Sequence, residues 1–318
     1  TGCADGSPYA YFVREGDPAR LLVFLQGGGA CWSALGCDPG ALPTYDGSVG
    51  PEDDPGAGAD GILALGDARN PFRGWSALFV SYCTGDVHLG DAPRTYPLVT
   101  EAEAAPGFVA MHHRGRANAE AALAWAFDRA PPERVFVTGE SAGAIASPYW
   151  AAVVAARWPE ARVAQLGDAA GGYRAGAVPD LLRTWGAVPA LREALDLPPD
   201  TAETPDFEAI YTGAGRRHPE LGLARLDRAE DLVQRFFLTE VGVFADPLHA
   251  LLRANLARIR EKVPRVRQYL APGPVHTTLA SPAFHTLEVR GTALRDWVEA
   301  HAAGKPVSDV ICEGCAAP

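Results

Sequence analysis

Short apolar runs alternate along the chain with longer segments of helical periodicity. The runs predict buried strands at Leu21–Leu25, Ala77–Tyr82, Arg134–Val137 and Arg162–Leu166. The helical patterns lie at Arg114–Ala130, Ala142–Arg157, Pro179–Leu195 and Thr292–Ala303. Strands that alternate with helices usually pair in parallel, and the helices then cover both faces of the sheet. The pattern therefore predicts an α/β fold with a mostly parallel central sheet flanked by helices.

Two long segments lack this pattern. Residues 31–75 are rich in Gly, Pro, Asp and Ala, and residues 84–107 carry few periodic apolar positions. Loops of this length in a compact protein are usually functional. Arg225–Gln234 is ambiguous in type and boundary, and its assignment stays open. No linker divides the 318 residues, so we expect one domain over residues 1–318 with long active-site loops.

Charge and composition exclude several classes of protein. The net charge of −11 argues against a nucleic-acid partner or an anionic membrane surface. No apolar stretch approaches the length of a membrane-spanning helix. Six cysteines, an even number, indicate an oxidising compartment. The chain starts at Thr1 without a signal-peptide pattern, so we expect a secreted or periplasmic monomer whose targeting segment is absent from this sequence.

The cysteines are best explained as structural disulfides. Cys312 and Cys315 form a Cys-x-x-Cys pair, but a zinc site needs a second pair of ligands that the sequence does not offer. A redox motif would sit at the start of a helix, not at a chain end. We therefore expect no metal, and the pairing stays open. A minor alternative is that Cys3 is the lipidated cysteine of a lipoprotein.

The motif Gly139-Glu-Ser141-Ala-Gly143 follows a predicted strand and precedes a predicted helix. A Gly-x-Ser-x-Gly sequence in this context is the nucleophile elbow of α/β hydrolases. The glycines let strand and helix approach closely, and the first N–H groups of the helix point at the reacting centre. The simpler alternative is a glycine-rich helix start with a capping serine.

A second glycine motif, Gly27-Gly28-Gly29, follows the first strong strand. Such a loop supplies one oxyanion donor in α/β hydrolases, and the residue after the nucleophile, Ala142, supplies another. Trp32 forms either an apolar wall for an acyl group or part of the core. A dinucleotide-binding loop would require a third glycine at fingerprint spacing and a following helix, and both are missing.

The base and its acid should follow the serine in chain order. His276 lies in a turn-rich loop after an apolar run, and His285 competes with it. His88, His112 and His113 precede the serine, and His218, His249 and His301 lie in contexts that look solvated. For the acid, Asp168, Asp227 and Asp231 remain equal on spacing alone.

Together these motifs resemble the pectin acetylesterase and Notum family, in a bacterial-type form. The resemblance spans nearly the whole chain. Its most specific part is Tyr82-Cys-x-x-Asp-Val-x-x-Gly90. The other matching segments are Cys3–Tyr9, Leu25–Trp32, Asn70–Trp75, Arg114–Asn118, Gly139–Gly143, Asp231–Gln234 and Gly273–His276.

The resemblance implies an α/β-hydrolase fold and serine ester hydrolysis without a cofactor. Carried over by motif, the nucleophile is Ser141 and the base is His276. The family's Asp-x-x-Gln segment assigns the acid to Asp231, and the oxyanion donors become the N–H groups of Gly28, Gly29 and Ala142. One departure is Gly29, where relatives carry a bulky residue, so we expect a wider pocket there. The resemblance also places Cys31, Cys37 and Cys83 near the active-site mouth.

The expected function is a serine carboxylesterase that removes acetyl groups from a pectin-like polysaccharide or cleaves short-chain esters. A polyester or lipid-type ester hydrolase would use the same machinery. A non-catalytic glycan- or lipid-binding protein and a nucleotide-dependent oxidoreductase are the rival classes. The acidic net charge weighs against anionic pectin unless arginines line the cleft.

Overall fold

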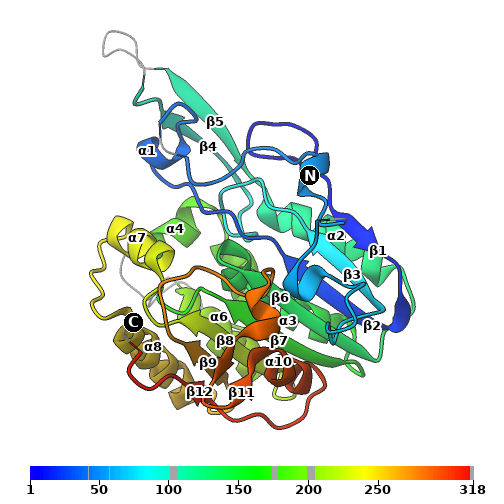
Figure 1. The fold of residues 1–318 in the computed structure, drawn as a ribbon. Helices are drawn as coiled ribbons and strands as arrows, with labels where there is room; N and C mark the ends of the chain where they lie inside the picture. The colour runs from blue at the N-terminus through cyan, green and yellow to red at the C-terminus, as the bar shows by residue number, and fades with distance from the viewer. Residues whose placement is uncertain (42, 57, 101–106, 174–177, 199–204, 316–318) are drawn as a thin grey trace.

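The computed structural model describes residues 1–41, 43–56, 58–100, 107–173, 178–198 and 205–315. Its centre is an eight-stranded sheet in the order β1-β3-β2-β6-β7-β8-β9-β12 (Figure 1). β1 pairs antiparallel with β3, and all other neighbours are parallel. The bounds are β1 Phe12–Arg14, β2 Asp17–Leu25, β3 Trp75–Val80, β6 Arg134–Glu140, β7 Arg162–Asp168, β8 Gly222–Arg228, β9 Arg267–Ala271 and β12 Val310–Ile311.

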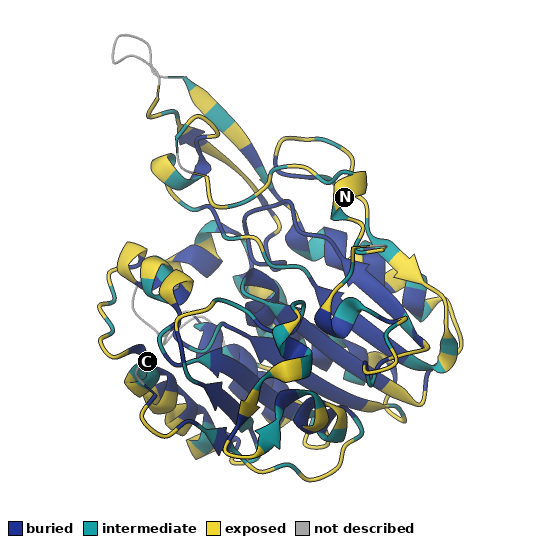
Figure 2. Ribbon diagram, in the orientation of Figure 1, coloured by how far each residue is buried: buried dark blue, intermediate teal, exposed yellow. Residues whose placement is uncertain are grey.

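The four predicted strands are all present in this sheet as β2, β3, β6 and β7. Leu21–Leu25 are buried without alternation, which is typical of a parallel strand that is covered on both faces (Figure 2). Leu22 lies between Ala77 and Phe136 in register. The mostly parallel sheet flanked by helices confirms the predicted α/β fold. Strands from both ends of the chain share this sheet, which supports the single domain that we predict.

The helices are α1 Ala34–Cys37, α2 Gly115–Phe127, α3 Ala142–Arg157, α4 Val178–Thr184, α5 Val188–Leu195, α6 Phe207–Arg217, α7 Leu232–Glu240, α8 Leu248–Lys262, α9 Ala283–Thr286 and α10 Leu294–Ala302. α3 packs against β6 and β7, and α6 packs against α3 and α8. Two short strand pairs lie outside the main sheet. They are β4 Ala92–Pro97 with β5 Phe108–His113, and β10 Glu288–Val289 with β11 Thr292–Ala293.

Two sequence-based assignments need correction, and the structure decides a third that was left open. The single helix expected at Pro179–Leu195 is divided into α4 and α5, because Gly186 adopts a φ of 74° that a helix does not allow. The segment 84–107 is not irregular throughout, since β4 lies in it and pairs with β5 in a hairpin that projects from the body (Figure 1). The ambiguous Arg225–Gln234 contains the end of one strand, β8, and the start of α7.

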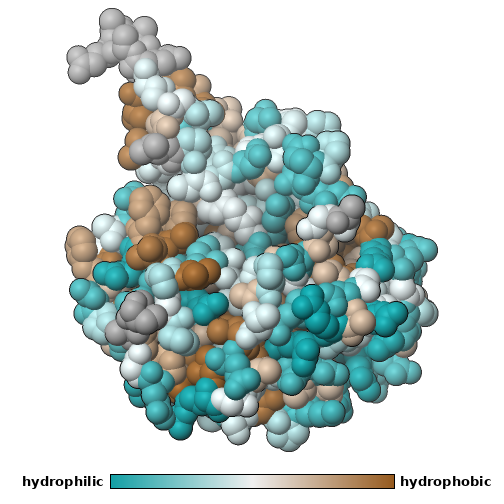
Figure 3. Space-filling view, in the orientation of Figure 1, coloured by the Kyte–Doolittle hydropathy of each residue, from teal (hydrophilic) through white to brown (hydrophobic). Residues whose placement is uncertain are grey.

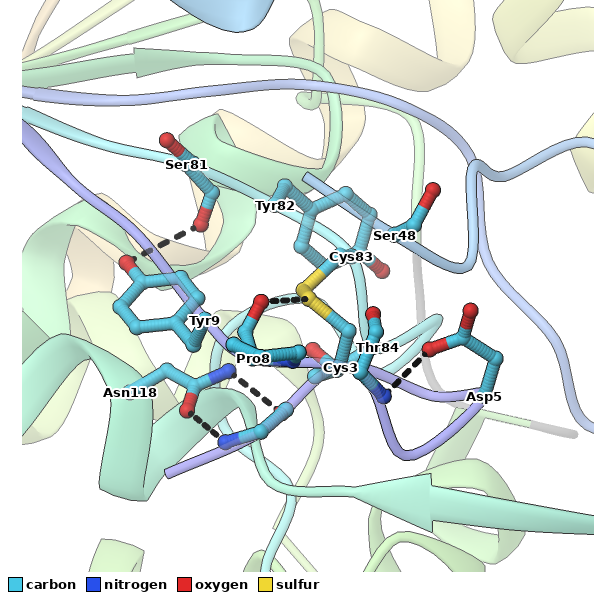
Figure 4. The surroundings of a disulfide bond; sticks show 12 residues. Cys3, Asp5, Pro8, Tyr9, Ser48, Ser81, Tyr82, Cys83, Thr84 and Asn118 are labelled. Carbon is cyan, nitrogen blue, oxygen red and sulfur yellow. Dashed lines mark hydrogen bonds between the residues drawn. A yellow bond between two sulfur atoms is a disulfide. The ribbon is translucent and has the colours of Figure 1, made fainter. Parts of the chain in front are cut away.

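Three disulfides join Cys3 to Cys83, Cys31 to Cys37 and Cys312 to Cys315. The first holds the N-terminal segment beside Tyr82 (Figure 4). Gly2 strengthens this attachment, because its N–H and C=O both bond to the Asn118 amide, at 3.0 and 2.9 Å. The sulfur of Cys3 is thus occupied, which contradicts the lipidation alternative.

Candidate active site

The predicted site residues all follow the carboxyl ends of parallel strands. Gly28 and Gly29 follow β2, Ser141 follows β6, Asp231 follows β8 and His276 follows β9. These strand ends lie at one edge of the sheet, which is where α/β proteins place their ligand sites. The sheet topology therefore brings together residues that are up to 248 positions apart in the sequence.

Ser141 occupies a strained turn between β6 and α3. Its φ of 50° and ψ of −116° are unusual for a residue with a side chain, and its N–H donates to the Asp168 carbonyl oxygen at 2.8 Å. The side chain makes no capping hydrogen bond to α3, so the alternative of a capping serine does not hold. The hydroxyl instead lines two cavities described below.

Glycines 139 and 143 are required by close packing around this turn. A Cβ on Gly139 would lie 2.6 Å from the carbonyl carbon of Gly143, and one on Gly143 would collide with the carbonyl oxygen of Leu25. Any larger residue would push α3 away from the ends of β2 and β6. The spacing of the motif thus follows from the geometry of the elbow.

Asp231 and His276 form a hydrogen-bonded pair. Asp231 is fully buried, and its Oδ2 lies 2.7 Å from His276 Nδ1. Its Oδ1 accepts the N–H groups of Val233 and Gln234 at 2.9 and 3.0 Å at the start of α7, and the Gln234 amide donates to Oδ2 at 3.1 Å. A carboxylate at Nδ1 selects the tautomer whose Nε2 carries a lone pair. Within the described part of the chain, this Nε2 is buried and has no hydrogen-bond partner.

The loop that carries His276 is anchored on both sides. Asp168 Oδ2 accepts the N–H groups of Thr278 and Leu279 at 2.6 and 2.7 Å. Arg228 donates to the Thr278 hydroxyl at 3.2 Å and to the Pro272 carbonyl at 3.0 Å. Burial raises the pKa of Asp168 to about 7, against the lowering effect of the two N–H donors. Asp168 therefore holds the loop of His276, and Asp231 contacts the imidazole itself.

Asp227, the third candidate acid, lies elsewhere in the network. It is buried beside Arg225, whose guanidinium lies 3.3 Å from its Oδ2, and it accepts the Gly171 N–H at 2.9 Å.

His285 lies near Asp67 and is not among the described residues that line the cavity of Ser141. His301 is buried against the Gln165 carbonyl at 2.9 Å and is not solvated as expected. Burial lowers its pKa.

The glycine loop is held by side chains from two neighbouring segments. Tyr82 is buried, its hydroxyl donates to the Gly29 carbonyl at 3.0 Å, and it accepts the Val87 N–H at 2.9 Å. Thr44 exchanges two hydrogen bonds with Ala30, at 3.0 and 3.3 Å. Among the described residues, the N–H groups of Gly28 and Gly29 have no acceptor. The loop is thus fixed with two donors unpaired.

The expectation of a wider pocket at Gly29 is wrong. Its φ is 71°, and a Cβ at this position would collide with the carbonyl oxygen of Thr44. Residue 44 of the long 31–75 segment fills the space that a bulky side chain would occupy.

Two cavities meet at Ser141. One is small, about 40 Å³, and is lined by apolar side chains that include Trp32, Ile145, Trp185 and Phe237. The other is open, about 330 Å³, and its wall contains His276, the glycine loop and two residues of α7, Val233 and Phe236. Phe237 lines both cavities and its ring lies 6.2 Å from that of Trp32. Trp32 is therefore a cavity wall and not a core residue.

The residues that line the small cavity could not be predicted from local sequence patterns. Tyr173, Leu181, Trp185 and Phe207 line it, and they come from three segments without a shared motif, with Leu181 and Trp185 both at α4. Trp185 also donates its indole N–H to the Cys31 carbonyl at 2.8 Å, which ties α4 to the loop with the Cys31–Cys37 disulfide. The signal for Tyr82 was present, because it opens the most specific motif of the chain.

The described residues contain no group of three or more His, Cys, Asp or Glu side chains that is arranged to hold a metal ion. They also contain no helix that is long and apolar enough to span a membrane.

Comparison with known families matches residues 1–175 to the model described as Pectinacetylesterase, which is more than half of the chain. The chain belongs to the pectinacetylesterase family. The matched part contains the glycine loop and the elbow of Ser141. Asp231 and His276 lie beyond it.

Curated relatives are palmitoleoyl-protein carboxylesterases. The chain is 36% identical to notum1' of Xenopus laevis over 96 residues, which is 29% of this chain and 20% of that protein. It is 34% identical over 97 residues to NOTUM of Mus musculus, covering 29% of this chain and 19% of that protein. A third relative, named inactive palmitoleoyl-protein carboxylesterase notum1b, of Danio rerio, is 35% identical over 96 residues, which is 29% of this chain and 68% of that protein. The chain thus spans about a fifth of the length of the first and second of these relatives.

Proposed function

We propose that this protein is a serine carboxylesterase, with Ser141 as nucleophile, His276 as base and Asp231 as the acid that orients it. The observation that carries the proposal is the shared cavity, where the strained serine, the unpaired Nε2 of His276 and the unpaired N–H groups of the glycine loop meet. Family membership supports ester hydrolysis as the reaction class.

The groups have the order that acyl transfer needs. His276 takes the proton of the Ser141 hydroxyl as its oxygen attacks the ester carbonyl, and Asp231 stabilises the imidazolium. The N–H groups of Gly28, Gly29 and Ala142 stabilise the negative charge on the carbonyl oxygen. His276 then protonates the leaving alcohol, and water repeats the sequence on the acyl-enzyme to release the acid.

The two cavities support separate places for the two halves of the ester. His276 must protonate the leaving oxygen, so we place the alcohol in the larger cavity that His276 lines and the acyl group in the smaller one. One water needs roughly 10–15 Å³ of such volume. A cavity of about 40 Å³ holds about three atoms of that size, which favours acetyl to butyryl groups.

Among the described residues of both cavities there is no arginine or lysine. The open cavity instead contains Glu140, whose pKa is raised by burial. Anionic pectin therefore gains no cation at this site, which favours uncharged short-acyl esters over polygalacturonate.

We also propose that the protein is exported and monomeric. The three disulfides support export, because such bonds persist in oxidising compartments.

The test is Ser141→Ala against a series of p-nitrophenyl esters from acetate to octanoate. We expect wild type to prefer two to four acyl carbons and the variant to lose nearly all turnover. A fluorophosphonate probe, which labels activated serines, should mark the wild type at Ser141 only. Full turnover by the variant would reject the nucleophile, and an unlabelled wild type without activity would favour a binding protein on the same scaffold.

A further inference from the structure

The alcohol side of the catalytic cavity continues into an exposed apolar surface. Leu232, Val233 and Phe236 on α7 have exposed fractions of 60, 36 and 50%, and Val275 beside His276 is 54% exposed. We call these four residues the apolar platform. Figure 3 shows hydrophobic side chains gathered over α7, and Figure 2 shows how much of that helix is exposed. Large apolar side chains that gather around a cavity usually mark a binding surface.

The platform is built onto the segments that carry the acid and the base. α7 starts directly after Asp231, and the Leu232 N–H donates to the Pro274 carbonyl at 3.1 Å, two residues before His276. The Glu230 N–H makes a second such bond to the Gly273 carbonyl at 3.1 Å. The platform is thus fixed relative to the group that protonates the leaving alcohol.

The platform is also continuous with the catalytic cavity. Val233 and Phe236 line the cavity of Ser141 and His276, and their neighbour Phe237 lines both this cavity and the acyl cavity. The rings of Phe236 and Phe237 lie 5.2 Å apart in an edge-to-face arrangement. An ester bound at Ser141 would therefore extend its alcohol portion along Phe236 toward Leu232 and Val275.

We propose that the substrates are short-acyl esters of bulky, uncharged, apolar alcohols, whose alcohol portion lies on the apolar platform. This inference rests on the proposed esterase function. The platform offers no polar side chain to a sugar, and no described cation lines the cavity for a uronate. A polyester fits less well, because its acyl portion continues as polymer and the small acyl cavity of about 40 Å³ gives that chain little room.

The test measures kcat/KM on methyl, butyl, hexyl and octyl acetate, each below its solubility limit, by titration of the released acid. Full burial of a methylene corresponds to roughly a fourfold gain, so half-burial on an open platform predicts about twofold per added methylene. Phe236→Ser should lower the octyl-to-methyl ratio by about tenfold, Leu232→Ser should lower it less, and Phe236→Leu should restore it. Phe108→Ser is the matched control, because Phe108 is 65% exposed but lies on the β4–β5 hairpin.

A second measurement separates this inference from the esterase proposal. The ketone 2-undecanone has the shape of octyl acetate but cannot be hydrolysed, and its binding to Ser141→Ala is measured by calorimetry. We expect this binding to weaken about tenfold when Phe236→Ser is added. Turnover by Ser141→Ala would overturn the proposed role of Ser141 in the esterase, and it would not affect the platform, which the acetate series measures. A flat acetate series in an active wild type would overturn the platform alone, as would faster deacetylation of pectin than of octyl acetate. A dimer that Leu232→Ser dissociates, with an unchanged acetate series, would also overturn it.

Discussion

Asp231→Asn tests the proposed acid most directly, because the hydrogen bonds around this side chain dictate how an amide must lie. Oδ1 accepts two backbone N–H groups, from Val233 and Gln234. An amide NH₂ in that place would face these two donors, whereas at the position of Oδ2 it would face one, the Gln234 amide, so the amide oxygen should replace Oδ1. The NH₂ group then replaces Oδ2, which faces His276 Nδ1 at 2.7 Å.

This orientation forces His276 into the wrong tautomer. Its Nδ1 must accept a hydrogen bond from the amide, so Nε2 carries the hydrogen and cannot take the proton of Ser141. The same tautomer change in a serine-protease triad costs about 10⁴ in kcat. We therefore expect a loss of about 10⁴-fold in kcat, equivalent to roughly 5.5 kcal/mol of transition-state stabilisation, with KM little changed.

The assay uses ethyl acetate beside p-nitrophenyl acetate, because nitrophenolate leaves without needing a proton from His276. Asp168→Asn is the matched control. Both of its N–H donors bond to one oxygen, Oδ2, so an amide oxygen can accept both and the loop of His276 keeps its anchor. We expect the control to lose less than tenfold. Asp231→Asn activity within tenfold of wild type, or a larger loss in Asp168→Asn, would refute the assignment of the acid.

Two further predictions concern Asp168 and Tyr82. In the folded protein the pKa of Asp168 is about 7, whereas in the unfolded chain it is near 3.8. Between about pH 4 and pH 7 the unfolded state therefore loses this proton while the folded state keeps it, so the free energy of unfolding falls as the pH rises. Asp168→Asn should therefore stabilise the protein more as the pH rises over that range, by at most about 4 kcal/mol. Urea unfolding of both proteins at pH 4.5, 6 and 8 measures this, and an equal gain in stability at all three pH values would contradict the prediction. Tyr82→Phe removes the hydrogen bond to the Gly29 carbonyl and should lower kcat about tenfold with KM nearly constant, because it loosens the oxyanion donors. Tyr9→Phe is its control, since within the described part of the chain the Tyr9 hydroxyl bonds only to the Ser81 carbonyl, at 3.3 Å (Figure 4). Equal losses in both variants would indicate general destabilisation.

The fold was predictable where a segment has one dominant environment. β2, β6 and β7 are buried on both faces, so their apolar runs identify them without reference to the rest of the chain. β9, with the sequence Arg-Gln-Tyr-Leu-Ala, is just as buried, but its apolar run is short and follows Arg267 and Gln268, so it was visible as a run without being assigned as a strand. β4 is a strand because β5 pairs with it, and its sequence, Ala-Pro-Arg-Thr-Tyr-Pro, has little strand character of its own.

The candidate site shows the same division. The elbow and the glycine loop are local motifs whose spacing follows from steric contact, so the sequence points to them directly. The choice among Asp168, Asp227 and Asp231 depends on which strand end faces His276, and spacing alone left all three open. The apolar platform had a visible but ambiguous signal, because Leu232, Val233 and Phe236 in α7 also fit a buried helix. Only the tertiary structure shows that this side of α7 faces solvent beside the cavity.

The family of this protein is easier to identify than its substrate, because different parts of the chain determine the two. The part that matches the family, residues 1–175, carries the proposed nucleophile and the glycine loop, which would handle the carbonyl group common to all esters. The proposed acid and base and the platform come from residues 231–276, and the alcohol would contact that second part. Two proteins can therefore share the first part and its reaction while they differ in the alcohol they release. If this reasoning is right, exchange of α7 and the His276 loop between family members should transfer alcohol preference. Acyl preference should change less, because the exchange replaces Phe237 of the acyl cavity but leaves Trp32, Ile145 and Trp185 in place.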